Sequence, residues 1–154
     1  MKKLWTVFLL IFIVCLIKPE YNFCNLSAEY KGTHCFYSSQ KIFDNNATTI
    51  KNGNGFIISC STLNAKSIKN KINNNFLYGE SFSFKGNKEQ INAILKKLKV
   101  NIVRQENLNE LYVLEGYTNL LNESIMLGED KINIQIAYND GIITVGYPLI
   151  LGGF

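Results

Sequence analysis

The stretch that most constrains the fold is the C-terminal segment from Lys131 to Ile150. Asp140-Gly141 is a favoured turn pair for a β-hairpin, and apolar residues alternate with small or polar ones on both sides of it. With the turn at this pair, one face of the hairpin is apolar throughout. Its pairs are Tyr138/Ile143, Ile136/Val145, Ile134/Tyr147 and Ile132/Leu149. A slip of one residue would pair apolar with polar side chains, so the sequence specifies the register.

The opposite face of this hairpin carries small or uncharged polar residues. Residues 78–84 predict a neighbouring strand of the same kind, in which aromatic residues alternate with glycine and serine, and Glu80 is the exception. We therefore expect an uncharged sheet face that is open to solvent. It is the candidate interaction surface, and its residues are Asn133, Gln135, Thr144, Ser81 and Ser83.

Residues 87–98 predict an amphipathic helix. Asn87 can cap it, and Gln90 stands three residues later, as in a capping box. The apolar stripe of this helix is Ile91, Ile94, Leu95 and Leu98. Further strands are predicted at 33–38, 56–60, 101–105 and 111–117, and short helices at 64–72 and 119–127. This order indicates an α+β protein in which helices back an antiparallel sheet.

The N-terminus has the form of an export segment. A basic start at residues 1–3 is followed by an apolar run over residues 4–17, which Lys18 ends. The run is short for a spanning helix, which needs about 20 apolar residues. Residues 1–18 are therefore predicted to be either a signal peptide or an uncleaved membrane anchor, and residues 19–32 a linker. Either way we expect an extracytoplasmic protein, secreted or anchored to the cell membrane.

The charge of the remaining chain argues against nucleic acid as a partner. The formal net charge is +4, but Lys2, Lys3 and Lys18 belong to the export segment. The part expected to fold is therefore close to neutral. Proteins that bind nucleic acids neutralise phosphates with clustered Lys and Arg. Arg104 is the only arginine, so no such cluster is expected.

The sequence offers little material for catalysis. His34 is the only histidine, and its neighbour Cys35 would point to the opposite face of a strand. No pair of cysteines has the spacing of a zinc site, and the carboxylates are scattered. We therefore expect no catalytic residue, no metal and no cofactor. A disulfide between Cys35 and Cys60 is one expectation for an exported protein, and buried free thiols are the other.

Residues 76–154 resemble YwmB-like proteins, which are exported proteins of spore-forming Firmicutes with a TATA-box-binding-protein-like fold. The segments that carry the resemblance are 78–103, which includes the predicted helix, 114–117 and, above all, 131–137 with 143–150. The resemblance implies a curved antiparallel sheet backed by helices, with residues 76–154 as the C-terminal lobe. Residues 33–75 are too short for a full first lobe and are expected to form an incomplete one. The resemblance supplies no catalytic residues.

The functional expectation is a non-enzymatic binding or interaction module outside the cytoplasm, with a role in the envelope or in sporulation. Its partner would be a protein or a component of the envelope. Two alternatives stay open. One is an envelope hydrolase that uses Asp and Glu side chains, and the other is a degenerate remnant that binds nothing.

Overall fold

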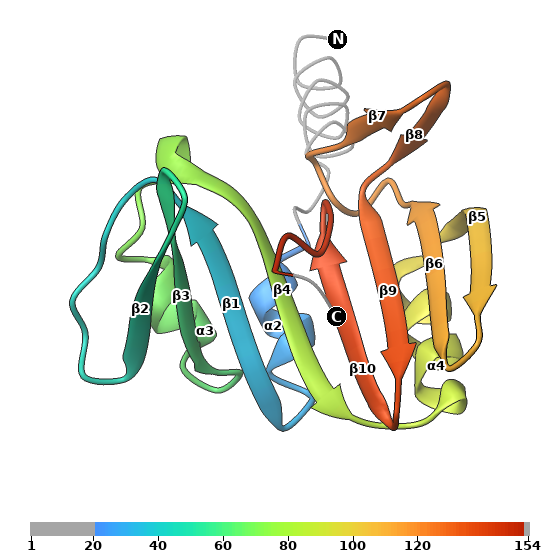
Figure 1. Cartoon of the computed structure of the whole chain (residues 1–154), viewed down its shortest axis with the longest axis horizontal. Coiled ribbons are helices and arrows are strands. Elements are labelled where there is room, and N and C mark those ends of the chain that lie inside the picture. Colours follow the sequence, from blue (N-terminus) through green and yellow to red (C-terminus); the bar gives the residue numbers. More distant parts are fainter. Residues whose placement is uncertain (1–20, 153–154) are drawn as a thin grey trace, which may run out of the picture.

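The computed structural model describes residues 21–152, so the predicted export segment lies outside the described residues. These residues form an α+β fold built on one eight-stranded sheet. In chain order its strands are β1 (Gly32–Ser38), β2 (Ala47–Asn52), β3 (Gly55–Ser61), β4 (Leu77–Lys85), β5 (Asn101–Leu108), β6 (Leu111–Tyr117), β9 (Ile134–Asn139) and β10 (Ile142–Tyr147). The order across the sheet is β2-β3-β1-β4-β10-β9-β6-β5, and neighbouring strands are antiparallel (Figure 1).

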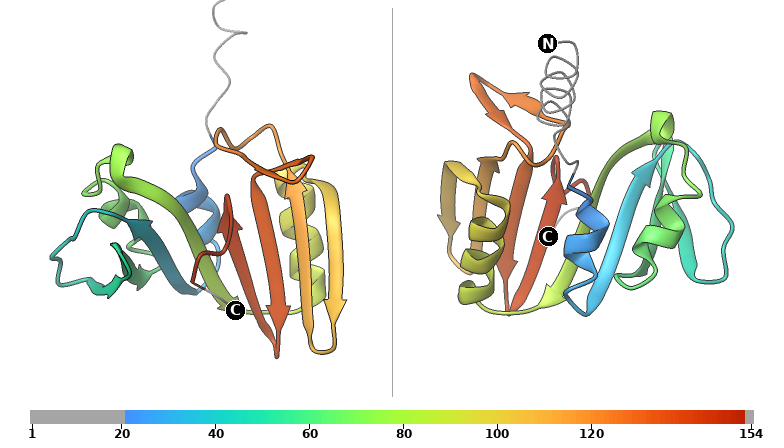
Figure 2. Two further views of the ribbon diagram at one scale, coloured as in Figure 1. Left: turned by 45° about the horizontal axis from the view of Figure 1, so that its top comes forward. Right: turned by 180° about the vertical axis from the view of Figure 1, so that it is seen from behind.

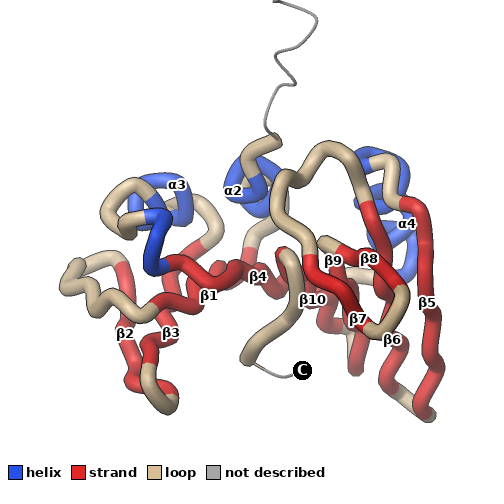
Figure 3. Tube along the Cα trace, turned by 90° about the horizontal axis from the view of Figure 1, so that it is seen from above, coloured by secondary structure: helices blue, strands red, loops and turns tan. Residues whose placement is uncertain are grey.

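The helices lie along one side of this sheet, as Figure 3 shows. They are α2 (Phe23–Ser27), α3 (Ala65–Lys69) and α4 (Lys88–Leu98), and a short 3-10 turn covers Asn74–Phe76. The predicted capping box of α4 is confirmed, since Asn87 and Gln90 exchange hydrogen bonds between side chain and backbone. No helix among residues 21–152 has the length and apolar character needed to cross a membrane.

The C-terminal hairpin is confirmed in its inner part. Ile143 pairs with Tyr138 and Val145 with Ile136, and both turn residues have positive φ angles, 46° at Asp140 and 74° at Gly141. The outer part of the prediction is wrong, because the ladder ends at Gly146 and Gln135. Ile132 belongs instead to a separate ribbon of β7 (Ile125–Leu127) and β8 (Asp130–Ile132), where it pairs with Ile125.

The helix predicted at residues 119–127 is also wrong. Residues 119–124 are a loop and residues 125–127 form β7, with Leu121 buried and Met126 62% exposed. The amide of Asn133 donates hydrogen bonds to the backbone carbonyls of Thr118 and Leu121, at 2.8 and 3.1 Å. These hydrogen bonds to a residue outside the segment hold its backbone in a non-helical conformation, which the spacing of its apolar residues does not predict.

Two clusters of buried side chains fill the space between the sheet and the helices. The larger contains the apolar faces of α4, β9 and β10, and the smaller lies between β1, β3 and α3. Phe23 and Leu26 belong to the larger cluster, and Cys24 belongs to the smaller. Residues 21–32, part of the predicted linker 19–32, therefore do not form a linker. They place α2 across both clusters.

Candidate functional site

The centre of the candidate site is a carboxylate in the core. The alternation along β4 puts Phe82 and Phe84 on the face that the helices cover, and Glu80 lies on that same face. Only 1% of Glu80 is exposed. Because an unpaired charge in such a place would be strongly destabilising, Glu80 needs partners inside the protein.

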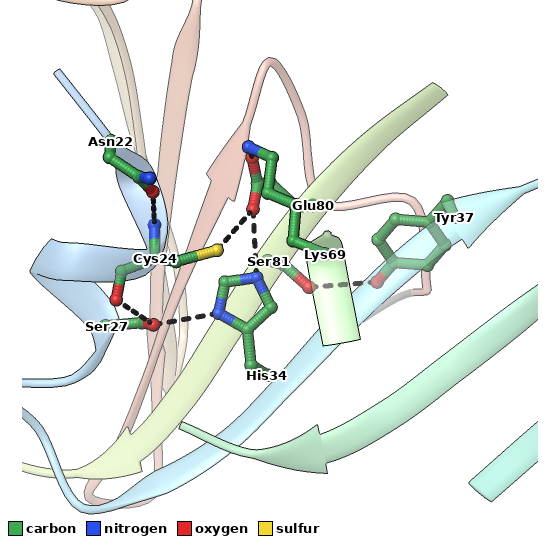
Figure 4. A network of polar contacts seen from close by, with 8 residues as sticks. All are labelled: Asn22, Cys24, Ser27, His34, Tyr37, Lys69, Glu80 and Ser81. Carbon is green, nitrogen blue, oxygen red and sulfur yellow. Dashed lines mark hydrogen bonds and ion pairs between the residues drawn. The ribbon is translucent and has the colours of Figure 1, made fainter. Parts of the chain in front are cut away.

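The partners come from three other elements, and together they form what we call the Glu80 cluster: Cys24, Ser27, His34, Lys69 and Glu80 (Figure 4). Lys69 Nζ lies 2.5 Å from one carboxylate oxygen, Oε1. The other oxygen, Oε2, lies 3.1 Å from His34 Nε2 and 3.5 Å from Cys24 Sγ. Since an ionised carboxylate only accepts hydrogen bonds, the imidazole and the thiol both donate to Oε2.

Local structure fixes each partner. Asn22 caps α2 by accepting from the backbone N–H of Cys24 at 3.0 Å. Ser27 lies one turn later, where its hydroxyl contacts His34 Nδ1 at 2.9 Å and the carbonyl of Cys24 at 3.0 Å. His34 is in the middle of β1 and is fully buried. Lys69 ends α3 and brings its charge to the cluster from the edge of the core.

The pKa shifts follow from this arrangement. Burial by itself raises the pKa of Glu80, but the hydrogen bond from His34 and the charge of Lys69 outweigh it and hold that pKa below its usual value. Burial lowers the pKa of Lys69, but the charge of Glu80 more than compensates, and the net shift is upward. The cluster therefore keeps an ionised carboxylate beside an ammonium group within the protein.

Cys24 is not prepared as a nucleophile by these surroundings. Burial and, after it, the nearby charge of Glu80 raise the pKa of its thiol well above the ordinary value. A thiol in this state is a weak nucleophile, because the reactive form is the thiolate. Cys24, His34 and Glu80 do, however, offer ligand atoms that all lie within 4.8 Å of one another.

A cleft adjoins the cluster where α2, α3 and the end of β10 meet. Its volume is about 410 Å³, and Lys69 and Tyr147 form part of its wall. Its other polar side chains are Tyr21, Asn22, Asn70, Asn74 and Asn122. A smaller cavity of about 120 Å³ lies beside Glu80 itself and shares Lys69, Asn74 and Tyr147 with the cleft. The polar cluster is thus connected to the surface through Lys69.

The predicted interaction face, on the other side of the sheet, is largely engaged in contacts within the chain. Ser81 is buried and hydrogen-bonded to the Tyr37 hydroxyl at 3.0 Å. Ser83 and Thr144 contact each other at 2.9 Å across β4 and β10. Gln135 donates to Glu115 at 3.0 Å. These side chains do share one face of the sheet, as the alternation predicts.

The end of the chain covers part of that face. The backbone N–H of Ile150 donates to the Gln135 side chain at 3.1 Å. After β10 the chain turns back along the sheet, as the left view of Figure 2 shows. A Cβ atom at Gly146 would lie 2.5 Å from the Ile150 nitrogen, so glycine is required there for the chain to pass. The face is therefore less open than the strand pattern predicts.

Two predicted features need correction. Asn133 is not on the open face, because it is fully buried, where its side chain accepts from Thr118 N–H at 2.8 Å. Cys35 and Cys60 do not form a disulfide, and both are free. Cys60 pairs with His34 across β1 and β3, whereas Cys35 pairs with Ser59, so the two thiols point to opposite faces of the sheet.

Sequence reasoning missed the Glu80 cluster. Cys24, His34 and Glu80 are widely spaced in the chain, and no motif connects them. One signal was present, since Glu80 interrupts an otherwise apolar alternation and so marks a charge on a core face. That signal identifies Glu80 but none of its partners. Cys24 and Ser27 lie in the predicted linker, and nothing in the sequence connects His34 or Lys69 with Glu80.

Comparison of the chain with protein-family models, with curated proteins and with solved structures gave no match. The site is therefore argued from its own geometry. The resemblance to YwmB-like proteins stays a prediction.

Proposed function

We propose that this protein is a non-enzymatic binding module that acts outside the cytoplasm. Its ligand is a polar component of the cell envelope, a saccharide chain in particular, and it binds in the cleft beside Lys69. The observation that carries this proposal is the cleft's lining of amide and phenol groups around one ammonium group.

The chemistry of the lining suits a ligand that is rich in hydroxyl groups. Each asparagine amide has two N–H donors and a carbonyl acceptor, so it can bond a hydroxyl in either direction. Asn70, Asn74 and Asn122 are exposed and have these groups available toward the cleft. Tyr21 and Tyr147 add flat surfaces with a polar end. A concave site with a few convergent polar groups is the usual form of a small-ligand site.

The sequence supports the same proposal. The predicted export segment would deliver the protein to the envelope, where saccharide polymers are abundant. We also propose that the sheet and its helices form a lobe like that of the TATA-binding fold, as the resemblance to YwmB-like proteins implies. In this proposal the fold serves as a scaffold, and nucleic acid is not its partner.

Co-sedimentation of the full-length chain with purified peptidoglycan tests the proposal. We expect the wild-type protein to bind and the Asn70→Ala/Asn122→Ala double variant to bind at least about tenfold more weakly. Each hydrogen bond contributes about 1 kcal/mol, and about 1.4 kcal/mol corresponds to a factor of ten.

The matched control is Asn92→Ala/Asn107→Ala, which removes two exposed amides on α4 and β5 that do not line the cleft. This control should bind as the wild type does. Absence of wild-type binding, or equal binding by the cleft variant, would overturn the proposal.

The same samples separate a binding module from an envelope hydrolase. Glu80, a deeply buried carboxylate beside the cleft, has a pKa below its usual value, which makes it a poor general acid. We therefore expect no release of reducing ends or free amines from peptidoglycan during prolonged incubation. Release that Glu80→Gln abolishes would favour the hydrolase instead.

A further inference from the structure

The Glu80 cluster brings together three ligand atoms of the types that bind transition metals. Thiol sulfur, imidazole nitrogen and carboxylate oxygen come from α2, β1 and β4, and all three residues are buried. Cys24 Sγ and His34 Nε2 both approach the same oxygen, Glu80 Oε2 (Figure 4). The three ligand atoms therefore lie close together although no sequence motif connects their residues.

We propose that Cys24, His34 and Glu80 bind a divalent transition metal of the zinc class through Sγ, Nε2 and Oε2. This proposal rests on the buried cluster and does not depend on ligand binding in the cleft. A sulfur and an imidazole nitrogen in the ligand set favour zinc and related metals over calcium or magnesium, which prefer oxygen ligands.

The distances agree with this assignment. Zinc is bound at about 2.3 Å by thiolate sulfur and at about 2.0–2.2 Å by imidazole nitrogen and carboxylate oxygen. Donor atoms at the corners of a tetrahedron of that size lie about 3.3–3.6 Å apart. The sulfur–oxygen distance here is 3.5 Å, and the nitrogen–oxygen distance is 3.1 Å. The third pair, Sγ and Nε2, lies within 4.8 Å, and these two atoms would close to the tetrahedral separation as the metal enters.

The neighbours of the three ligands already hold them in the required orientation. Lys69 binds Oε1 of Glu80 at 2.5 Å, which leaves Oε2 for the metal. Ser27 lies 2.9 Å from His34 Nδ1 and 3.0 Å from the Cys24 carbonyl. When Ser27 donates to that carbonyl, its oxygen accepts from Nδ1–H, so the proton on Nδ1 is held in place and the proton on Nε2 is the one that the metal replaces. Such outer contacts orient histidine and carboxylate ligands in known metal sites.

Metal binding changes the protons of the cluster in a defined way. The Sγ–H bond of Cys24 breaks, its proton passes to solvent, and the electron pair stays on sulfur as the metal bond forms. The Nε2–H bond that His34 directs at Oε2 in the metal-free cluster breaks as well, its proton passes to solvent, and its electron pair binds the metal, so the imidazole keeps a single proton on Nδ1. Thiolate and carboxylate then offset the two charges of the cation, and the ammonium of Lys69, which is 25% exposed, keeps its own positive charge beside them. The cavity of about 120 Å³ beside Glu80 has room for a water molecule.

The consequence for the fold is a cross-link between α2 and the sheet. Cys24 is on a helix of five residues, whereas His34 and Glu80 are on adjacent strands. A metal bound by all three would tie this short helix to β1 and β4. We therefore expect the metal to raise the thermal unfolding midpoint of the protein.

Cobalt(II) provides the first test, with the full-length chain in mild detergent. The chain carries Cys15→Ser, which removes the cysteine of the predicted export segment as a competing thiol. A thiolate-to-cobalt charge-transfer band should appear and saturate at a single metal ion per chain. Cys24→Ser should lose the band, whereas the matched control Cys35→Ser should keep it, because Cys35 points to the other face of the sheet. Absence of the band in folded wild-type protein, or its persistence in Cys24→Ser, would overturn the proposal.

The second test needs no variant of the cluster and so does not depend on whether Cys24→Ser folds. His34 is the only histidine, so its ring nitrogen signals in nuclear magnetic resonance are unambiguous. Saturating Zn²⁺ should fix the Nδ1–H tautomer, and ¹¹³Cd²⁺ should show scalar coupling to Nε2. If Nε2 stays protonated at saturating Zn²⁺, the cluster is a hydrogen-bonded core network and not a metal site.

Discussion

At the scale of single residues, Glu80 is the most consequential position. A carboxylate on a core face would destabilise the fold if it were alone, yet this one receives donors on both oxygens. The members of the cluster depend on one another. Removing any partner leaves a buried polar group without its hydrogen bond, which destabilises the fold.

Glu80→Gln tests this dependence. The change removes the negative charge and leaves the ammonium of Lys69 without its partner, so we expect the free energy of unfolding to fall by about 3 kcal/mol. This is the lower end of the range for breaking a buried ion pair, since Lys69 is 25% exposed and can turn toward water. Urea denaturation measures the change. The matched control Glu106→Gln, on exposed β5, should stay within about 0.5 kcal/mol of the wild type.

The pH dependence of the free energy of unfolding, measured for wild type and Glu80→Gln, tests whether the loss of stability is electrostatic. The pKa of Glu80 in the folded state is below its ordinary value of 4.5, so its stabilising contribution is present above that pH and is lost as the pH falls further. The stability difference between wild type and Glu80→Gln should therefore narrow in acid. A difference that stays constant from neutral pH to about pH 3 would contradict an electrostatic origin.

At the scale of elements, those with strong local signals formed as predicted. The α4 helix has its capping residues in sequence, and the inner hairpin has its turn pair and its alternation. The segment 119–127 shows the limit of such signals. There the hydrogen bonds of Asn133, which is distant in the sequence, decide the course of the backbone.

Removing the helix cap tests whether the local signal contributes to stability. Asn87→Ala takes away the side chain that accepts from the backbone N–H of Gln90 at 3.2 Å, and we expect a loss of about 1 kcal/mol in the free energy of unfolding. Asn92→Ala, at an exposed position within the same helix, is the comparison and should change stability by less than about 0.5 kcal/mol. Equal effects from both substitutions would mean that the cap is not the cause.

At the scale of the whole molecule, α2 connects the two buried clusters. Phe23 packs on Phe82 and Tyr147, with ring centroids 5.3 and 5.6 Å apart, while Cys24 faces the smaller cluster. Strands from both halves of the chain also belong to one continuous sheet. The halves should therefore unfold together.

Phe23→Ala tests this connection. A cavity at a fully buried aromatic position should lower the free energy of unfolding by about 3–5 kcal/mol. Hydrogen exchange should show that amides of β3 and β6 lose protection to the same extent, because both depend on α2. Phe43→Ala, at a side chain that is 82% exposed, is the control and should leave both strands protected. Loss of protection in only one of the two strands would show that the halves are independent.

The sequence by itself determined the α+β class, the helix α4 and the hairpin, because their causes are local: a cap, a turn pair and a periodic pattern. Only the tertiary structure decided the role of residues 21–32, the burial of Asn133 and the separation of Cys35 from Cys60. It also decided the Glu80 cluster. These features depend on which residues, distant in the sequence, lie on the same face of the sheet and within a few ångströms of one another. That proximity exists only after the strands have paired and a short helix has packed across them.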